Sequence, residues 1–349
     1  MNLHSLSPKA WSPLPLFSGF TVSGSDANQF LQGQLTNDVI ALASSRSQRT
    51  GYCTPKGRLM AAFLQWRISD DTLGHLIPTP LLESTTKRLK MFVLRSKAVF
   101  SGPERTLSAF GLWLDDATAS AMPGNAGDVA AVSGLAKGQA WLIREGDGET
   151  GARLWLIADP EGLPEVQQHL ASHADRMRSQ EAWLASEITS GQPWIWPQTV
   201  EAFVPQMINF ELIGGVSFKK GCYPGQEVVA RSQYLGKLKR RTFHVSAQLS
   251  DETLHALFGN RSADGGHPLA VLLGADIWSS PDETQPVGQV VDAAHTVRAD
   301  GSLDPISIHL LVEATLDAWS HGALSLGGLT DAFPRLAQEK LPYLLSTPE

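Results

Sequence analysis

The 349-residue sequence has only two cysteines, Cys53 and Cys222, and it has no CxxC pair. Two cysteines exclude a disulfide-stabilised scaffold and any four-cysteine metal site. The chain also lacks a run of about 18 apolar residues, which excludes a transmembrane helix. Its first twenty residues contain no basic stretch followed by an apolar one, so we expect no secretory signal. Together these absences predict a protein of the reducing cytoplasm.

The composition is that of a globular protein, with 42% hydrophobic and 18% charged residues. These proportions exclude general disorder. Because a domain typically has about 100–200 residues, the length predicts two or three domains. Hydrophobic spacing and turn signals predict strands at 17–22, 61–68, 93–100 and 153–158, and helices at 27–35, 80–92, 164–170 and 180–189.

After Arg241 the pattern changes to short β-type runs separated by glycine, aspartate and proline turns. Such evenly spaced strands are typical of a small barrel or sandwich, so we place a domain boundary near Arg240. The runs lie at 242–247, 269–273, 287–291 and 306–313.

The acids outnumber the bases by 35 to 28, which gives a net charge of −7 and argues against non-specific binding to nucleic acid. Charge is unevenly placed, because the strip from Lys219 to Arg241 has seven bases and one acid, Glu227. Its excess of +6 leaves −13 for the rest of the chain. The basic strip predicts a localised anionic partner, and the alternative is a plain solvated face.

Residues 209–231 carry the strongest chemical signal. Cys222 stands before a Pro-Gly turn, in which proline presets φ and glycine accepts a positive φ. We expect a cysteine at such a turn to lie near the surface, where Lys219 and Lys220 favour its thiolate form. The alternative is a small buried side chain without reactivity, and for Cys53 that is the better interpretation.

Eight residues around this cysteine, KGCYPGQE (220–227), resemble the signature of the YgfZ family of folate-binding, tRNA-modification and iron–sulfur-maintenance proteins. Three further segments are similar to family segments and stand in family order: LQGQLTNDV (31–39), YCTPKGR (52–58) and FVPQMINFELIGGVSFKKG (203–221). The resemblance covers residues 15–240. It implies the fold of the glycine-cleavage T protein, an aminomethyltransferase with three lobes around a central folate opening.

We therefore expect an α+β, three-lobed fold with a small C-terminal β-barrel. Residues 1–110 together with 176–240 would form the folate-binding core. Residues 111–175 would form a ferredoxin-like α+β lobe, and residues 241–349 the barrel.

The resemblance also implies roles for the residues of the signature. Cys222 is the expected reactive or cluster-proximal thiolate, with Lys220 holding that form and Tyr223 flanking it. No metal site is expected. Expected cofactor-binding or loop-fixing residues are Asn209, Gly221, Gly225, Gln226, Glu227 and Arg231.

Two aromatic positions are associated with folate in this family. Trp183 matches a family tryptophan on a helix, and Phe17 stands where the family has a second tryptophan. Aromatic rings offer a flat pteridine a stacking surface. Phenylalanine can stack but has no indole N–H, and for both residues the alternative is a place in the core.

The T protein has carboxylates a few residues after a glycine turn, and Ala61 and Ala62 occupy the matching positions here. Alanine can neither orient the folate nitrogen nor stabilise charge that develops on it. We therefore expect no aminomethyltransferase activity. The alternative is a tetrahydrofolate-dependent one-carbon transferase with a displaced acid.

The resemblance thus implies a folate-binding accessory protein that supports iron–sulfur cluster assembly or repair and iron–sulfur-dependent tRNA modification, and the composition adds the expectation that it is cytoplasmic. Its expected cofactor is tetrahydrofolate, and its expected partners are iron–sulfur proteins such as tRNA methylthiotransferases. No DNA binding and no membrane contact are expected. For the basic strip, a solvated face or the folate tail is favoured over direct contact with tRNA. A non-catalytic interaction protein with a vestigial folate site is the remaining alternative.

Overall fold

The structure is a computed structural model that describes residues 1–115, 125–148, 151–234, 238–259, 266–279, 285–321, 324–328 and 333–345. The chain divides into two compact units. Unit 1 comprises Met1–Thr50 and Phe63–Trp183, and unit 2 comprises Gly51–Ala62 and Leu184–Glu349. The finer division into three domains stays a prediction.

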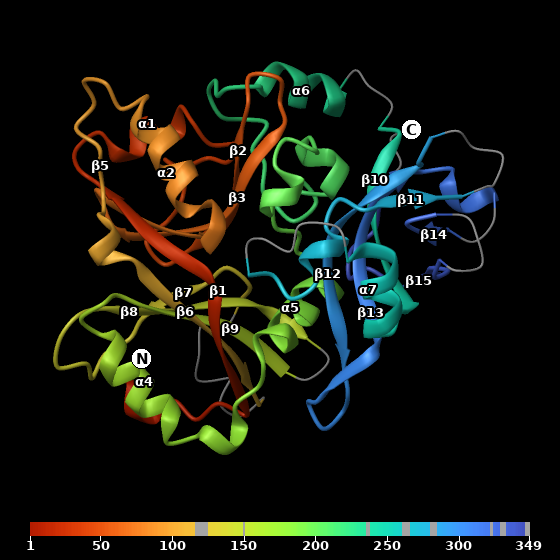
Figure 1. Ribbon diagram of the computed structural model, residues 1–349. Coiled ribbons are helices and arrows are strands. Elements are labelled where there is room, and N and C mark those ends of the chain that lie inside the picture. Colours follow the sequence, from red (N-terminus) through yellow and green to blue (C-terminus); the bar gives the residue numbers. More distant parts are fainter. Residues whose placement is uncertain are drawn as a thin grey trace. The chain divides into compact units, whose positions relative to one another are not determined.

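The first half of the chain alternates strands with short helices (Figure 1). Its strands are β1 (Ala10–Ser23), β2 (Ser47–Cys53), β3 (Leu59–Ser69), β4 (Thr72–Pro78), β5 (Val99–Phe100), β6 (Leu107–Leu114), β7 (Val129–Ala131), β8 (Ala140–Gly148) and β9 (Gly151–Ala158). Its helices are α1 (Ala27–Gln32), α2 (Leu82–Lys90), α4 (Leu163–Ala171) and α5 (Gln180–Thr189). Short 3₁₀ turns lie at Leu3–Ser5, Thr79–Leu81, Pro103–Arg105 and Ala174–Arg176.

Among the described residues, these nine strands form one sheet in the order β2-β3-β4-β1-β6-β9-β8-β7, with β5 paired to β1. The pairs β1–β4, β1–β5, β1–β6, β3–β4, β6–β9, β7–β8 and β8–β9 are all antiparallel. Because side chains alternate across a strand, β6 and β9 each present two different faces.

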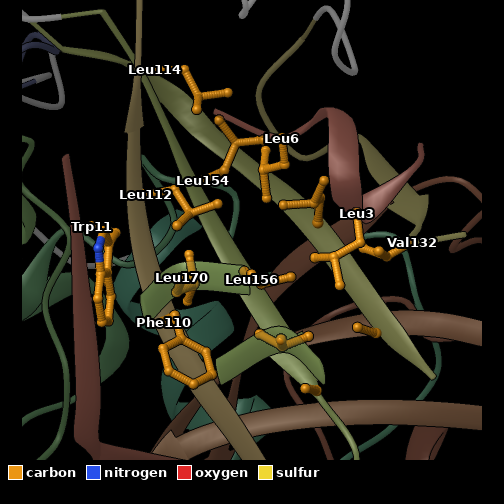
Figure 2. Close-up of a cluster of buried hydrophobic side chains, with 14 of the residues drawn as sticks. Leu3, Leu6, Trp11, Phe110, Leu112, Leu114, Val132, Leu154, Leu156 and Leu170 are labelled. Atoms are coloured by element: carbon orange, nitrogen blue, oxygen red, sulfur yellow. The ribbon is translucent and has the colours of Figure 1, made fainter. Parts of the chain in front are cut away.

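One face of β6 and β9 packs against α4 and the N-terminal residues to form a core of buried side chains (Figure 2). Leucines and Phe110 from the strands meet Val166 and Leu170 of the helix and Leu3 and Leu6 of the N-terminus. The opposite face carries Gly111, Trp113, Arg153 and Trp155, with Gly111 opposite Trp155 and Trp113 opposite Arg153. The side chains on this second face contact the candidate folate residues described below.

In the second half of the chain, helix α6 (Gln226–Tyr234) precedes an antiparallel sheet. Its strands are β10 (Arg240–Gln248), β11 (Asp276–Trp278), β12 (Gly288–Val297), β13 (Leu303–Thr315), β14 (Ser325–Leu326) and β15 (Ala337–Gln338), in the order β14-β11-β12-β13-β10-β15. Helix α7 (Asp251–Phe258) follows β10, and 3₁₀ turns lie at Pro197–Thr199, Pro205–Ile208, Ala270–Leu272 and Ala318–His321.

Backbone bonds close this sheet. The amide of Leu326 in β14 donates to the carbonyl of Pro334 at 3.0 Å, and the amide of Leu336 donates to the carbonyl of Leu324 at 2.8 Å. These bonds join β14 to the residues that enter β15, which in turn pairs with β10. The predicted α+β class and C-terminal barrel are therefore confirmed.

Two predicted strands are wrong. The segment 93–100 turns back after α2 through bonds such as that from the Ser96 amide to the Val93 carbonyl (2.8 Å), and only Val99–Phe100 is a strand. The run 269–273 contains the buried 3₁₀ turn Ala270–Leu272. Both stretches are short, and over so few residues the apolar pattern alone does not separate a strand from a turn.

Candidate functional site

The loop that carries Cys222 lies against the turn between β2 and β3 within unit 2. Gly225 has φ +83°, and a Cβ added to it would overlap the carbonyl oxygen of Thr54 and lie 2.6 Å from the Cα of Gly57. Gly57 has φ +73°, and its own Cβ would lie 2.9 Å from the Cβ of Val228. Only glycine tolerates both the positive φ and this approach. The segments YCTPKGR and KGCYPGQE are therefore parts of one site.

The β2–β3 turn is fixed by its own backbone. The amide of Gly57 donates to the Thr54 carbonyl and the amide of Thr54 donates to the Arg58 carbonyl, both at 2.8 Å. The Arg58 side chain donates to the carbonyl of Ala202. The turn is thus a rigid surface for the cysteine loop.

Cys222 is a free and exposed cysteine at this junction, as the sequence predicted. Its neighbour Tyr223 is buried, and the Nζ of Lys220 lies 5.1 Å from the centre of the Tyr223 ring. Such cation–π contacts hold an ammonium group in place. Burial, with a smaller contribution from Cys53, raises the pKa of the Tyr223 phenol, so this hydroxyl is neutral at physiological pH. Lys220 and Tyr223 therefore form the inner side of a loop whose outer side is the thiol.

Cys53 is also free but buried at the end of β2. Burial raises the pKa of its thiol to about 12. Because the thiolate is the reactive form, Cys53 is inert at neutral pH.

Helix α6 begins directly after Gly225 and presents Glu227 and Arg231 to solvent. Their side chains form an ion pair of 2.8 Å one helical turn apart. Gln226 starts the helix, and its amide donates to the Tyr223 carbonyl at 3.1 Å. Gly221 has neither a positive φ nor a neighbour within 4 Å of an added Cβ, so the geometry itself does not require glycine there.

Asn209 lies behind the loop, fully buried and with φ +56°, a conformation in which asparagine is enriched. Its amide nitrogen donates to the Thr242 carbonyl at 2.7 Å, and its amide oxygen accepts from the Thr242 N–H at 3.3 Å. These bonds attach the motif to β10. A folate-binding role for Asn209 stays a prediction.

Most of the basic strip has partners within unit 2. Arg240 pairs with Glu313, Arg241 pairs with buried Glu211, and Arg231 pairs with Glu227. Lys220 lies over Tyr223 as described. Lys237 lies outside the described residues. Because Glu227 belongs to the strip itself, only Glu211 and Glu313 are acids distant in sequence, and they neutralise two of the six excess charges read from the sequence.

The two predicted folate aromatics belong to one cluster in unit 1. Phe17 packs edge-on against Trp155 with ring centres 5.1 Å apart, and Trp155 packs edge-on against Trp183 at 4.7 Å. Trp113 contacts Trp183 at 5.3 Å, and the guanidinium carbon of Arg153 lies 5.4 Å from the centre of the Trp183 ring. Trp183 also lies on the backbone of Gly111, where any Cβ would overlap the indole. We name Phe17, Trp113, Trp155 and Trp183 the aromatic cluster.

A buried charge group adjoins the aromatic cluster. Glu145 accepts a hydrogen bond from the Trp155 indole N–H at 2.8 Å and pairs with Arg49. Burial works to raise the pKa of Glu145, but Arg49 and Arg153 outweigh it and hold that pKa below its usual range. The carboxylate is therefore ionised, and the positive charges of Arg49 and Arg153 both stabilise it.

The positions that would carry the acids of the T protein lie in β3, where Ala61 and Ala62 are both fully buried. In the described part of the chain, no group of three or more His, Cys, Asp or Glu side chains is placed to hold a metal ion. None of the described helices has the length and hydrophobicity that a membrane crossing requires.

The sequence analysis missed three residues of these sites. Gly57 was visible only as part of a family segment, and its contact with Gly225 needs the fold. Arg153 and Trp155 stand two residues apart in a predicted strand, so the sequence predicts that they share a face. Nothing in the sequence places Trp183 on that face.

Comparison with known proteins gives the family. No family model matches the chain. A protein of Colwellia psychrerythraea described as tRNA-modifying protein YgfZ is 32% identical over 267 residues, which cover 73% of this chain and 78% of that protein. A protein of Edwardsiella ictaluri with the same description is 28% identical over 85% of this chain and 89% of its own length.

The crystal structure of the glycine cleavage system aminomethyltransferase T from Bartonella henselae matches with a TM-score of 0.60. The match covers 98% of this chain and 88% of that one at 15% identity, so it shows the fold alone. The predicted aminomethyltransferase fold is thereby confirmed. With relatives of this identity and coverage, and with the signature around Cys222 at the surface of the fold, the chain belongs to the YgfZ family.

Proposed function

We propose that this chain is a folate-binding accessory protein that supports iron–sulfur cluster assembly or repair and, through it, the modification of tRNA. Its relatives are described as tRNA-modifying proteins, which supports the tRNA part. The observation that carries the proposal is the exposed thiol of Cys222 on a loop held against the β2–β3 turn. The signature KGCYPGQE, through the family resemblance, supports the link to iron–sulfur proteins.

The geometry supports a transient rather than a storage role for Cys222. Cysteine thiolates are the usual ligands of iron–sulfur clusters, which take about four of them. In the described residues of unit 2, Cys53 is the other cysteine, and it is buried. A cluster that reaches Cys222 would therefore keep its other ligands on the client protein. The fixed loop would present one thiolate to it, with the ammonium group of Lys220 behind.

The aromatic cluster supports folate as the small molecule. A folate is a flat heteroaromatic ring with an anionic tail, and the cluster combines aromatic surfaces with the guanidinium group of Arg153. Trp183 itself is fully buried, with Gly111 on one side and Arg153 near its ring. A pteridine that stacks on Trp183 therefore has to displace the Arg153 side chain, which could then bind the ligand's oxygens. Bound folate would supply one-carbon chemistry, and no step of this kind is assigned to the residues present.

The experiment is complementation of a cell that lacks its own homologous protein, read out as methylthiolated nucleosides in digested tRNA. Cys222→Ser should fail to restore the modification, whereas Cys53→Ala, which leaves the exposed thiol intact, should restore it. Full restoration by Cys222→Ser would overturn the thiol role. Folate binding is tested separately by titrating the purified protein with tetrahydrofolate and following tryptophan fluorescence, and an unchanged signal together with no heat in calorimetry would overturn that part.

A further inference from the structure

A second surface, in unit 1, has no place in the proposed function. The segment from Lys87 to Val99 runs from the end of α2 through a turn into β5, in the orange part of Figure 1. We name it the α2–β5 segment. It exposes four large apolar side chains, which are Met91 (60%), Phe92 (46%), Leu94 (88%) and Val99 (63%). Single exposed apolar residues are ordinary, but four in nine positions indicate a contact surface.

The same segment is strongly basic. Its five bases are Lys87, Arg88, Lys90, Arg95 and Lys97, and no acid occurs between Glu83 and Glu104. No ion pair joins these bases to the described part of the chain, in contrast to the arginines of the basic strip. The α2–β5 segment therefore keeps its local charge of +5 on a chain with a net charge of −7.

The segment is held in a defined conformation. The Lys97 amide donates to the Asp26 carboxylate at 2.7 Å, and the Asp26 amide donates to the Lys97 carbonyl at 3.3 Å. Turn bonds from Met91, Phe92 and Ser96 complete it. Leu94 has φ +45°, which costs a leucine about 1–2 kcal/mol. Leu94 is exposed, so burial within this chain does not offset the cost of its backbone conformation. Contact with another molecule would offset it.

We propose that the α2–β5 segment is the docking site for a protein partner, which presents a segment of apolar and acidic residues. The apolar side chains of the partner would cover Met91, Leu94 and Val99, and its carboxylates would pair with the bases around them. Apolar burial gives such interfaces their affinity, and charge complementarity gives them orientation and speed of association.

The observations favour a protein over the other anionic surfaces. An RNA would meet the bases but leave Met91, Leu94 and Val99 without apolar contacts. A bilayer of anionic lipid would also face the acidic remainder of the chain, whose charge is −12 once the segment's +5 is set aside. Arg95 and Lys97 also stand between Leu94 and Val99, so the apolar residues do not form one uninterrupted tip for insertion. A short segment of a partner protein that has both acidic and apolar residues complements the bases and the exposed apolar side chains of the α2–β5 segment.

The test uses a fluorescent amphipathic peptide of leucine and glutamate, with a matched peptide in which lysine replaces every glutamate. We expect the full-length protein to bind the acidic peptide about tenfold more tightly than the basic one, as measured by fluorescence anisotropy. Leu94→Asn should reduce this binding about fivefold or more, and since asparagine accepts a positive φ, it should not lower the stability of the fold.

Two further variants complete the test. The double variant Arg95→Glu with Lys97→Glu should reverse the preference between the two peptides. Met177→Asn changes another exposed apolar residue of unit 1 and should leave binding unchanged. Equal binding of both peptides, or undiminished binding by Leu94→Asn, would overturn the proposal. So would tighter binding of tRNA or of phosphatidylglycerol vesicles that the same variants abolish, or concentration-dependent self-association that Leu94→Asn removes.

Discussion

Gly57 and Gly225 meet backbone to backbone, so that a single methyl group on Gly225 would lie 2.6 Å from the Cα and the amide nitrogen of Gly57. These glycines belong to segments 168 residues apart, one in the turn after β2 and the other in the loop of Cys222. Both have a positive φ, so neither can be replaced without strain. The contact explains why the cysteine loop has one defined position, and it links the stability of unit 2 to the presentation of the thiol.

Replacement of Gly225 tests this contact. We expect Gly225→Ala to destabilise the protein by about 2–4 kcal/mol, because it combines an unfavourable φ with an overlap against Thr54 and Gly57. Gly214→Ala is the matched control, since Gly214 also has a positive φ of 74° but nothing lies within 4 Å of its added Cβ. It should cost only about 1 kcal/mol. Equal losses in urea unfolding of the two variants would show that the Gly57 contact does not matter.

The two thiols should differ strongly in reactivity. With its pKa raised to about 12 by burial, Cys53 has a thiolate fraction on the order of 10⁻⁴ at pH 8. Iodoacetamide should therefore label Cys222 in the native protein and Cys53 only after unfolding, as peptide mass spectrometry can measure. Cys222→Ser should show no native labelling, and Cys53→Ala should label as the wild type does. Labelling of Cys53 at a comparable rate would contradict the assignment of Cys222 as the reactive thiol.

The long periodic elements were predictable from the sequence, because their pattern is local. The helix 180–189 and the strand 153–158 agree with α5 and β9 within two residues, and the change of pattern near Arg240 marks the start of β10. The segment 93–100 was wrongly predicted as one strand because only some of its apolar residues belong to the core. Leu94 and Val99 are exposed, whereas Ala98 and Phe100 are buried, and a pattern of hydrophobicity does not distinguish a buried strand from an exposed turn.

The candidate site was predictable only in part for the same reason. A Pro-Gly turn is a local signal, so the exposure of Cys222 could be inferred. The partial neutralisation of the basic strip could not be inferred, because Arg241 pairs with Glu211 and Arg240 pairs with Glu313, and these acids are 30 and 73 residues away. The burial of Trp183 against Gly111 likewise depends on a long-range contact between α5 and β6.

Trp183→Phe tests the aromatic cluster as the folate site. Phenylalanine keeps part of the ring and avoids the large cavity that alanine would leave. We expect the affinity for tetrahydrofolate to fall by about 1–2 kcal/mol, which isothermal titration calorimetry can measure without relying on fluorescence. The control is Trp141→Phe, a buried tryptophan of unit 1 that packs on Trp66 outside the cluster, and it should bind as the wild type does. Unchanged binding by Trp183→Phe would place the folate site elsewhere.

The buried pair of Arg49 and Glu145 predicts a specific dependence of stability on pH. Because Arg49 and Arg153 hold the folded-state pKa of Glu145 below the ordinary 4.5, the ionised pair stabilises the fold above that value. This contribution should be lost as pH falls below 4.5 through the lowered folded-state pKa. Glu145→Gln should lower the free energy of unfolding by about 3–5 kcal/mol at pH 7, because it leaves a buried guanidinium without its carboxylate. The variant should also lose less stability than the wild type as pH falls below 4.5.

Urea unfolding between pH 3 and pH 7 measures the effect. Glu211→Gln is the control with the opposite sign, because burial raises the pKa of Glu211 despite its pairing with Arg241. Protonation of Glu211 should therefore stabilise the folded state as pH falls. Replacing Glu211 removes this gain, so the free energy of unfolding should fall more steeply with decreasing pH. If Glu145→Gln keeps the wild-type slope below pH 4.5, the lowered pKa is not responsible for the acid loss.

The last prediction concerns the alanines that occupy the acidic positions of the aminomethyltransferase. Ala61 and Ala62 are fully buried in β3, and we expect no transfer of an aminomethyl group to tetrahydrofolate by the wild-type protein. Ala62→Asp should not create activity, because one acid does not supply the oriented substrates that the reaction needs. It should instead destabilise the fold by several kcal/mol, or by about 1.4 kcal/mol for each unit by which the new carboxyl raises its pKa. Ala62→Ser, which adds a smaller polar group without a charge, separates the cost of charge from that of volume. Turnover by the wild-type protein in an assay with a methylene donor would reinstate the one-carbon transferase, and an acid elsewhere, such as Asp38 or Glu227, would then have to take the role.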